Sequence, residues 1–329
     1  MINCAVIGLG NMGKHHARVY SQLKSSNLVA VADIRPHRGK LLAEKFNCNF
    51  YTDYKEMIRN ENIDAVSIAV PTSKHYDVAL FCINSKLHLL LEKPIAANLE
   101  EAISISNASN KNGLILQVGH IEHFNPAVVK LIEILKQDLL GKLLTIVIRR
   151  VGIAPPQILD ANVIVDLAIH DIELCNTITN QIPENIYCRA GAGILPDRED
   201  FADIFLEYNG VNVLIQANWI TPVKIRQMHL TGTKGYAELD FIEQKLSLAK
   251  TVVERDYDDF GTFVVKFGQS KMIDIPVVSD EPLKLEIRHF LECILENKQP
   301  SIDGQGAIEA LKVALKAWET SSGKKKLNN

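Results

Sequence analysis

The sequence predicts a two-domain protein: a Rossmann-type, doubly wound parallel α/β sheet over residues 1–120, and an α+β domain with a large, mostly antiparallel open sheet over residues 121–329. Three observations support this division. The length of 329 residues exceeds the size at which one hydrophobic core usually stops growing. Up to about residue 120, short apolar segments alternate with helical stretches. Beyond that point, most apolar segments follow one another without helices between them.

The first half alternates strand and helix. Its strands are short and almost entirely apolar, which is typical of a parallel sheet covered on both faces. We expect strands at residues 4–7, 28–32, 65–70, 88–91 and 114–118. We expect helices at residues 12–23, 39–46, 75–85 and 99–112.

The second half begins and ends with helices. Val128, Leu131, Ile132 and Leu135 recur at helical spacing and predict a helix over residues 126–136. Further helices are expected at residues 163–179, 282–297 and 305–320. Strands are expected at residues 145–149, 186–190, 202–208, 211–219, 227–231, 236–240, 245–249 and 273–277. One face of this sheet should be covered by helices, and the other solvated or buried in an oligomer.

Composition argues against several classes of protein. With 47% hydrophobic residues and a net charge of -3, the chain is too apolar for a disordered protein and lacks the excess of Lys and Arg that electrostatic nucleic-acid binding needs. The six cysteines form no Cys-x-x-Cys pair, which favours reduced thiols. We find neither a signal-peptide pattern nor an apolar run near the roughly 20 residues of a membrane-spanning helix. We therefore expect a cytoplasmic protein without membrane or nucleic-acid partners.

A glycine-rich loop at residues 8–13, with the sequence GLGNMG, joins the first predicted strand to the first helix. In that context G-x-G-x-x-G is the dinucleotide-binding fingerprint. Gly8 allows a tight turn, Gly10 lets the backbone approach a pyrophosphate, and Gly13 lets the helix pack closely on the strand. The helix N-terminus offers N–H groups to the phosphates, so we expect Asn11 and Met12 to contact the cofactor too.

Asp33 stands at the end of the second predicted strand, twenty positions after Gly13. An acid there accepts hydrogen bonds from the adenosine ribose and disfavours a 2′-phosphate. We therefore expect NAD rather than NADP, with Arg35 beside Asp33 at the same site. Arg35 and Arg38 keep NADP open as the alternative, because a nearby Arg accommodates the 2′-phosphate.

Three further motifs carry a family resemblance: VPTSKH at residues 70–75, EKP at residues 92–94 and DLAIH at residues 166–170. With the glycine loop, and in this order, they resemble T-P-x-x-x-H, E-K-P and D-x-x-x-H of the glucose-fructose oxidoreductase, inositol dehydrogenase and rhizopine-catabolism family. Val70 replaces the usual Thr. The resemblance covers essentially the whole chain and implies an NAD-dependent sugar dehydrogenase. It implies cofactor contacts at Pro71, Thr72, His75, Glu92 and Lys93.

Within that family the chain looks most similar to UDP-N-acetylglucosamine 3-dehydrogenases. Residues 119–128 and 218–226 carry this likeness, although His123 stands where relatives tend to have Arg. The resemblance implies oxidation of the 3-hydroxyl of a UDP-N-acetylhexosamine (UDP-N-acetylglucosamine or its uronate) to a ketone, often as the first step toward a 3-amino sugar. It also implies homodimers or homotetramers formed through the second sheet.

Oxidation of a secondary alcohol needs a base, a donor for the developing alkoxide and a hydride acceptor. Asp166 and His170 are four residues apart on a predicted helix and so share a face. We expect His170 to be the base, since it titrates near neutral pH, and Asp166 to support it. Lys93 ends a strand on the ligand-binding side of the sheet and is the expected donor to the reacting oxygen. Taken alone, Asp-x-x-x-His on a helix is more often a surface pair, and Glu-Lys-Pro could be an ordinary loop after a strand; the family motifs in their order favour the catalytic interpretation.

The diphosphate of a UDP-sugar needs cationic donors. Lys224 and Arg226 point to one face if that segment is extended, and Arg149 and Arg150 end another strand. These side chains could hold the diphosphate or the uracil. A solvated strand face is the open alternative for these cations. We expect the remaining contacts at His120, beside the cofactor or substrate, and at Phe124 and Asn125, beside the substrate.

Two alternatives remain open for the function. The chain could oxidise another polyol or sugar, such as inositol, or it could be a non-catalytic regulator that keeps the cofactor fold. No metal is expected, because nicotinamide chemistry needs none and the mixed acids and histidines form no fixed ligand set. His15 and His16 are expected on the exposed or interface side of the first helix.

Overall fold

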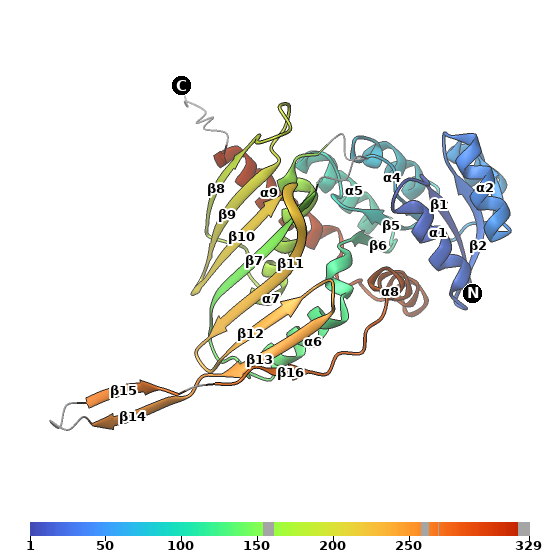
Figure 1. The fold of residues 1–329 in the computed structure, drawn as a ribbon. Coiled ribbons are helices and arrows are strands. Elements are labelled where there is room, and N and C mark those ends of the chain that lie inside the picture. Colours follow the sequence, from blue (N-terminus) through green and yellow to red (C-terminus); the bar gives the residue numbers. More distant parts are fainter. Residues whose placement is uncertain (154–160, 258–262, 269, 322–329) are drawn as a thin grey trace. The chain divides into compact units, whose positions relative to one another are not determined.

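The computed structural model describes residues 1–153, 161–257, 263–268 and 270–321, and it divides into two compact units (Figure 1). Residues 1–124 and 281–312 form most of unit 1, and residues 125–153 and 162–280 form most of unit 2. The units are described separately below. The expected boundary near residue 120 lies close to the first crossing of the chain between them.

Unit 1 contains the predicted Rossmann sheet. Its strand order is β3-β2-β1-β4-β5-β6, and every neighbouring pair is parallel, which is the doubly wound order. The strands are β1 (Ile2–Ile7), β2 (Ser26–Ala32), β3 (Asn49–Tyr51), β4 (Ala65–Ile68), β5 (His88–Glu92) and β6 (Leu116–Gly119). Because all run the same way, their carboxyl ends meet at one edge of the sheet.

The helices of unit 1 follow the strands as predicted, with one addition. They are α1 (Gly13–Gln22), α2 (Pro36–Phe46), α3 (Tyr54–Asn60), α4 (His75–Asn84), α5 (Leu99–Lys111) and α8 (Pro282–Glu296), with 3₁₀ turns η1 (Thr72–Lys74) and η2 (Ile121–Phe124). The sequence did not predict β3 or α3. Both are too short to show a hydrophobic period, although Asp53 caps α3 by accepting from the backbone N–H of Lys55 at 2.9 Å.

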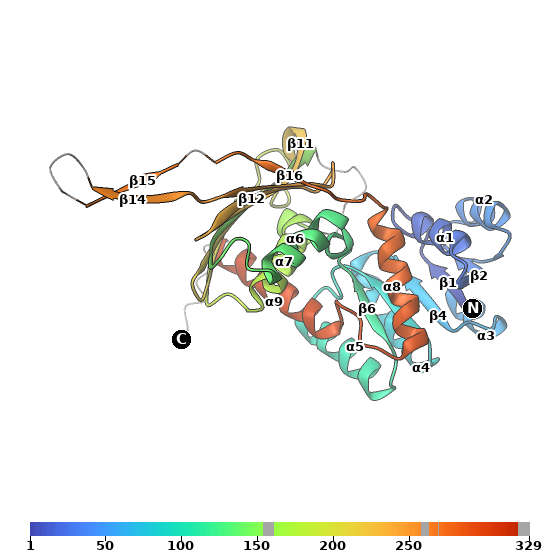
Figure 2. The same ribbon diagram turned by 90° about the horizontal axis from the view of Figure 1, so that it is seen from below.

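The assignment of α8 differs from the expected domains, which placed all residues after 120 in the second domain. Leu283, Ile287, Phe290 and Leu291 of α8 are buried in the same hydrophobic cluster as Tyr20 of α1. These side chains form one apolar stripe at helical spacing, and the stripe packs on α1 (Figure 2). The late helix therefore completes the core of the cofactor domain.

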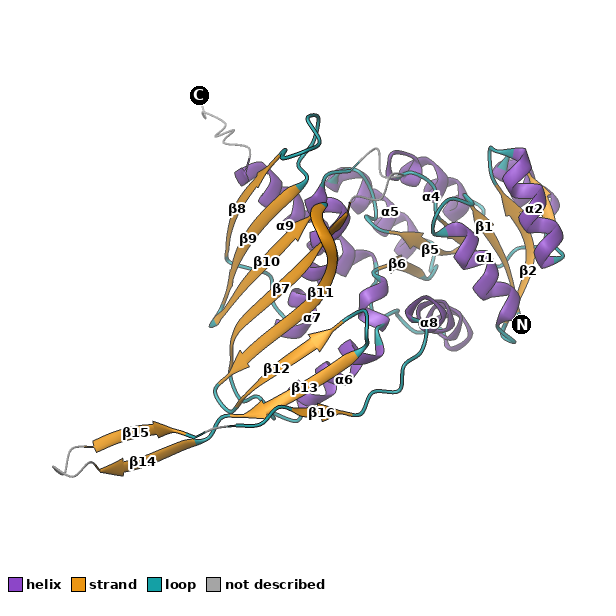
Figure 3. Cartoon of the chain, in the orientation of Figure 1, coloured by secondary structure: helices purple, strands orange, loops and turns teal. Residues whose placement is uncertain are grey.

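Unit 2 is built on an eight-stranded sheet with the order β16-β13-β12-β11-β7-β10-β9-β8 (Figure 3). Its described strand pairs are antiparallel except β10 with β7, as the sequence predicted for a mostly antiparallel sheet. The strands are β7 (Leu143–Ile153), β8 (Asn185–Gly191), β9 (Phe201–Tyr208), β10 (Val211–Asn218), β11 (Ile220–Gly232), β12 (Gly235–Asp240), β13 (Lys245–Lys250) and β16 (Ile273–Ile275). A separate ribbon, β14 (Val253–Tyr257) with β15 (Phe263–Phe267), was not predicted.

Helices cover one face of this sheet. They are α6 (Pro126–Lys136), the π-helical turn η3 (Ile164–Ala168) and α7 (Ile169–Thr179) (Figure 2). Helix α9 (Gly304–Ser321) starts within unit 1 and ends in unit 2. Along β7, Ile146, Ile148 and Arg150 are buried, whereas Arg149 is exposed. This alternation separates a covered face from an outer face.

Unit 1 also buries an acid that no ion pair compensates in the part of the chain described. Glu286 of α8 is fully buried, and burial together with the charge of Glu92 raises its pKa well above the usual value. The folded state therefore favours the protonated form of this carboxyl. The unfolded chain ionises near pH 4.5, so the folded state loses stability as pH rises from there toward the raised pKa.

We predict that Glu286→Gln removes this pH dependence. The unfolding free energy of the variant, relative to the parent, should increase by up to about 1.4 kcal/mol per pH unit above pH 5. Unfolding in denaturant at several pH values between 5 and 8 measures the difference. Glu292→Gln, an exposed position on the same helix, is the control. A difference for Glu286→Gln that does not change with pH would contradict the assignment.

Candidate cofactor and catalytic site

The glycine loop has the geometry that its fingerprint requires. Gly8 has a φ of +86°, and a Cβ there would lie 2.6 Å from the carbonyl oxygen of Ala69. A Cβ on Gly13 would lie 1.8 Å from the carbonyl oxygen of Gly8. Only glycine fits at either position. A Cβ on Gly10 would meet no protein atom within 4 Å, so the protein itself does not require glycine there. An approaching pyrophosphate does.

The N-terminus of α1 follows this loop and suits an anion. In the described structure no side chain caps it, and its first turn carries no acidic residue. Its N–H groups and the positive end of the helix dipole are therefore directed at the loop. Asn11 is exposed there, and Met12, the residue before the helix, packs partly on the hydrophobic cluster. The residues present fit a dinucleotide phosphate.

Asp33 follows β2 directly, at the predicted position. Its Oδ2 accepts a hydrogen bond from the backbone N–H of Leu9 at 2.7 Å, and its Oδ1 accepts from that of Arg35 at 2.8 Å. Nη1 of Arg38 lies 4.0 Å from Oδ2. The carboxylate is thus tied to the glycine loop, and it keeps further lone pairs for ribose hydroxyls. The side chain of Arg35 is exposed.

Two more loops leave the same edge of the sheet. Pro71 and Thr72 follow β4, with Thr72 opening η1, and Lys93 and Pro94 follow β5 with a cis bond between them. His120 directly follows β6 and is 1% exposed. The carboxyl ends of open parallel sheets form the ligand crevice, so Lys93 lies where the sequence placed it.

His75 is buried between the loops that follow β4 and β5. It is 1% exposed, and its ring contacts two backbone carbonyls: Nδ1 lies 2.8 Å from the oxygen of Pro94, and Nε2 lies 3.0 Å from that of Val70. Burial lowers the pKa of His75, although both carbonyls act in the opposite direction. The expected cofactor contact of His75 stays a prediction; in this structure its ring holds the backbone of the two loops.

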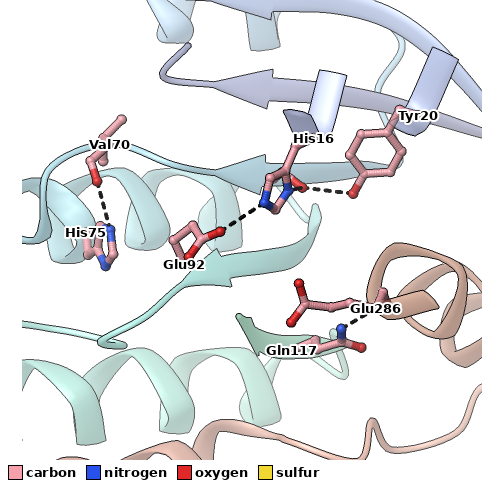
Figure 4. Close-up of polar contacts among 8 residues, drawn as sticks. His16, Tyr20, Val70, His75, Glu92, Gln117 and Glu286 are labelled. Carbon is pink, nitrogen blue, oxygen red and sulfur yellow. Dashed lines mark hydrogen bonds and ion pairs between the residues drawn. The ribbon is translucent and has the colours of Figure 1, made fainter. Parts of the chain in front are cut away.

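His16 is also fully buried, which corrects its expected exposed position, whereas His15 is exposed. Nε2 of His16 lies 2.9 Å from Glu92 Oε1, and Nδ1 of His16 lies 3.0 Å from the Ser67 hydroxyl (Figure 4). Burial alone raises the pKa of Glu92, but the hydrogen bond and charge of His16, with Lys93 and His75, hold it below the usual value. Glu92 is thus an ionised, mostly buried partner of His16.

The two remaining catalytic candidates lie in unit 2. Asp166 is half-buried in η3, and His170 is 9% exposed in the first turn of α7. Both belong to one continuous helical segment, as predicted. Asn162 precedes it and accepts from the backbone N–H groups of Ile164 and Val165, both at 3.0 Å. This cap fixes where the segment begins.

The adjacent acid, Asp171, is paired in the core with Arg150, which the sequence had offered instead as a diphosphate or uracil contact. Asp171 is fully buried and accepts a hydrogen bond from Nε of Arg150 at 2.8 Å, and Nη2 of Arg150 lies 2.7 Å from the same carboxylate in an ion pair. The guanidinium of Arg150 also lies 4.8 Å from the ring centre of Phe241. A buried pair of this kind needs both members. Arg150 therefore anchors α7 to β7, next to His170.

The side chains predicted to bind the diphosphate do not all lie on the same face of the second sheet. Arg226 pairs in register with Arg150 and lies on the helix-covered face. Lys224 lies beside Gly152 near the same end of β7, because a Cβ on Gly152 would contact its side chain at 3.6 Å. Arg149 instead lies on the outer face, where it donates to Gln216 at 3.3 Å. The structure does not bring Arg149 together with Asp166 and His170.

Phe124 and Asn125 have packing roles. Phe124 is 8% exposed and packs on His289, with 5.3 Å between ring centres. Asn125 is 2% exposed; its Oδ1 caps α6 by accepting from Ala127 N–H at 3.1 Å, and its amide donates to the Phe241 carbonyl at 2.9 Å. The expectation that these two side chains contact substrate stays a prediction; within the protein they take part in packing and in backbone hydrogen bonds.

Comparison with known proteins agrees with this geometry. Residues 2–120 match the model of the GFO/IDH/MocA oxidoreductase family for its NAD-binding Rossmann fold, and residues 128–238 match the C-terminal domain of the same family. The chain belongs to the GFO/IDH/MocA family. It is accordingly an NAD-binding oxidoreductase, as the glycine loop and Asp33 predicted.

Relatives of different specificity resemble this family member over nearly its whole length. A UDP-N-acetylglucosamine 3-dehydrogenase of Acidithiobacillus ferrooxidans is 28% identical over 94% of both chains. The solved structure of the enzyme of that name from the same organism has a TM-score of 0.84 at 26% identity and covers 97% of both chains. A myo-inositol 2-dehydrogenase of Thermotoga maritima is 24% identical over 93% of this chain and 92% of that protein.

The described residues of this oxidoreductase show neither a cluster of metal ligands nor a membrane-spanning helix. They contain no group of three or more His, Cys, Asp or Glu side chains arranged to hold a metal ion. Within the same ranges, we find no helix with the length and apolar character needed to span a membrane.

The glycines allow a selective test of NAD binding. We predict that Gly10→Ala weakens NADH binding on the order of tenfold or more and leaves the thermal unfolding midpoint of the cofactor-free protein unchanged, because its Cβ meets no protein atom within 4 Å. Gly13→Ala should lower that midpoint, since its Cβ collides with the carbonyl of Gly8. NADH fluorescence titration and thermal unfolding measure both. Equal destabilisation by the two substitutions would contradict this assignment.

Proposed function

We propose that this chain oxidises the 3-hydroxyl of a UDP-N-acetylhexosamine, UDP-N-acetylglucosamine or its uronate, to the 3-keto sugar with NAD. The observation that carries the proposal is Lys93 at the carboxyl end of β5, in a chain that aligns over 94% of its length with a UDP-N-acetylglucosamine 3-dehydrogenase. Lys93, Asp166 and His170 stand at the family's motif positions. We further propose that residues 1–120 form the cofactor domain and residues 121–329 the substrate and oligomerisation domain, with α8 as an addition to the first.

Each proposed catalytic group has a distinct task. His170 removes the hydroxyl proton of the sugar as general base. The Lys93 ammonium donates to the same oxygen and stabilises its developing negative charge. Asp166 stabilises the imidazolium that His170 becomes, or hydrogen-bonds the sugar. NAD, when bound, supplies the hydride acceptor.

Substrate affinity requires cations for the diphosphate. Lys224 and Arg226 remain the proposed donors, because they lie on the helix-covered side of the sheet near the end of β7. Arg149 is not proposed for this role, since it lies on the outer face. A substrate-sized anion needs only a few such groups, which agrees with the small net charge of -3.

A polyol such as inositol is the second candidate substrate. The 24% identity to a myo-inositol 2-dehydrogenase over nearly the whole chain favours it. Such a substrate has no diphosphate, so Lys224 and Arg226 would not affect its turnover. A non-catalytic regulator would have no need of Lys93 and His170, both of which are present.

We also propose that copies of this chain associate through the outer face of the second sheet, as dimers or tetramers. Tyr187, Phe205, Leu214, Val147 and His229 form a row across five strands, because each is in register with the next. Tyr187 is 55% exposed and Leu214 is 43% exposed. A row of apolar and aromatic side chains on an open sheet face is typical of an interface.

We predict that the purified protein reduces NAD with UDP-N-acetylglucosamine or its uronate and forms a 3-keto sugar. A panel that includes both nucleotide sugars and inositol, with NADH absorbance and mass spectrometry of the sugar, measures this, and a 2-oxo acid is added to recycle bound NADH. Turnover of inositol but not of either nucleotide sugar would show that the substrate is a polyol. No turnover of any alcohol would favour the hypothesis of a non-catalytic regulator.

The assigned base is tested in the same assay. His170→Asn should lower kcat on the order of 10²-fold or more, the usual contribution of a general base. Exposed His15→Asn is the control and should leave kcat unchanged. Unchanged turnover in His170→Asn would refute the base.

For the interface, we predict that Leu214→Glu lowers the native mass, because it places a charge in the middle of the apolar row. Light scattering after size exclusion measures the mass. Val129→Glu is the matched control, since Val129 is 45% exposed on α6, away from the outer face. An oligomer that persists in Leu214→Glu, or a monomeric parent protein, would contradict the proposed interface.

A further inference from the structure

Two buried histidines contact the same short turn from two different helices. His16 of α1 reaches the Glu92 side chain, and His75 of α4 reaches the Pro94 carbonyl. Glu92 and Pro94 are the two neighbours of Lys93. We propose that His16 and His75 are positioning residues that hold the Glu92 side chain and the Pro94 backbone, on the two sides of Lys93, and so orient its ammonium. This inference deepens the proposed function and rests on the role assigned there to Lys93.

The contact of His16 has a defined direction. The ionised Glu92 carboxylate only accepts, so Nε2 of His16 carries the proton and donates. Ser67 in turn contacts Nδ1 at 3.0 Å, and Tyr20 contacts the Ser67 hydroxyl at 2.9 Å. His16, Tyr20 and Ser67 are all fully buried. The chain of hydrogen bonds, visible in Figure 4, therefore fixes the ring and through it the Glu92 side chain.

The contact of His75 acts on the backbone itself. A neutral imidazole has one N–H, and both of its partners are carbonyl oxygens that only accept. A ring nitrogen without a proton would point its lone pair at the lone pairs of the carbonyl oxygen, and this repulsion is strongest at the shorter distance. The contact of Nδ1 with the Pro94 oxygen, at 2.8 Å, is shorter than that of Nε2 with Val70, at 3.0 Å, so the geometry assigns the N–H to Nδ1. His75 thus donates to the residue after Lys93 and stays within 3.0 Å of the loop at Val70.

Gln117 and Tyr20, two other buried polar groups nearby, have partners outside the turn. Gln117 donates from its side chain to the backbone carbonyl of Glu286 at 3.1 Å (Figure 4), and Tyr20 ends the hydrogen-bond chain two partners away from Glu92. Lysine has a long, flexible side chain. Holding its backbone limits where the ammonium reaches, and misplacement of a catalytic group by about 1 Å costs on the order of 10²-fold in rate.

Substitution of a histidine by asparagine or glutamine tests the contacts of its two ring nitrogens one at a time. The amide nitrogen of Gln occupies the place of the histidine Nε2, and that of Asn occupies the place of Nδ1. At position 16, Gln keeps the Glu92 contact and Asn loses it. At position 75, Asn keeps the Pro94 contact and Gln loses it. The proposal therefore predicts opposite preferences at the two positions.

The expected result is a crossed pattern in the full-length protein. His16→Asn and His75→Gln should lower kcat on the order of 10- to 100-fold with the best substrate of the panel, and each should raise deuterium exchange of the peptide that contains Lys93. His16→Gln and His75→Asn should stay within about threefold of the parent kcat, a change well below that loss. NADH affinity should change little in all four, so that the loss lies in kcat. Tyr20→Phe, which removes only the last bond of the chain, is the control.

A merely structural role predicts a different result. It lowers stability and NADH binding with either substitution and shows no crossing, and that outcome overturns the proposal. Lys93→Met is measured in parallel. If it keeps the parent kcat, the role of Lys93 fails, and this inference fails with it. If Lys93→Met is inactive and the crossed pattern is absent, only the histidine proposal fails. Deuterium exchange of the peptide that contains Lys93 tests whether the two histidines hold this turn, even where no alcohol is turned over.

Discussion

The close approach of α1 to the first sheet is the constraint on which the rest of unit 1 depends. A Cβ at Gly13 would lie 1.8 Å from the carbonyl oxygen of Gly8, so the helix begins here only because these positions have no side chain. That approach directs the helix N-terminus at the cofactor loop. It also brings His16, farther along the same helix, to the Glu92 carboxylate at the end of β5. One packing requirement thus links cofactor binding to the turn that carries Lys93.

Buried charge is handled differently in the two units. In unit 1, Glu92 stays ionised beside a histidine, and Glu286 favours the neutral form because burial and the charge of Glu92 oppose its ionisation. In unit 2, Asp171 and Arg150 neutralise each other within the core. A charge removed from water is costly unless it is paired or protonated. Arg149, one residue away on the other face of β7, is exposed and needs no such buried partner.

Hydrophobic period predicted most helices and strands, because apolar residues at spacings of two or about 3.6 reveal which face is buried. It did not predict β3, α3 or the ribbon of β14 and β15, whose segments are short or lack a clear apolar period. In the site, the glycine loop and Asp33 were predictable since each joins consecutive elements. The backbone contacts of His75 and Asn125 were not, because the same residue type serves a ligand or a backbone carbonyl, and only the neighbours in space decide which.

The sequence by itself determined the fold class, the NAD-binding loop and the family, because these depend on local order along the chain: a strand, three glycines, a helix and a few short motifs. The tertiary structure alone decided that α8 completes the cofactor domain, that Arg150 anchors α7, and that His16 is buried at Glu92. Ser67 and Glu92, the partners of that histidine, lie 51 and 76 positions away. No local pattern contains such contacts, since they arise only when the parallel strands align their carboxyl ends and α1 packs across them.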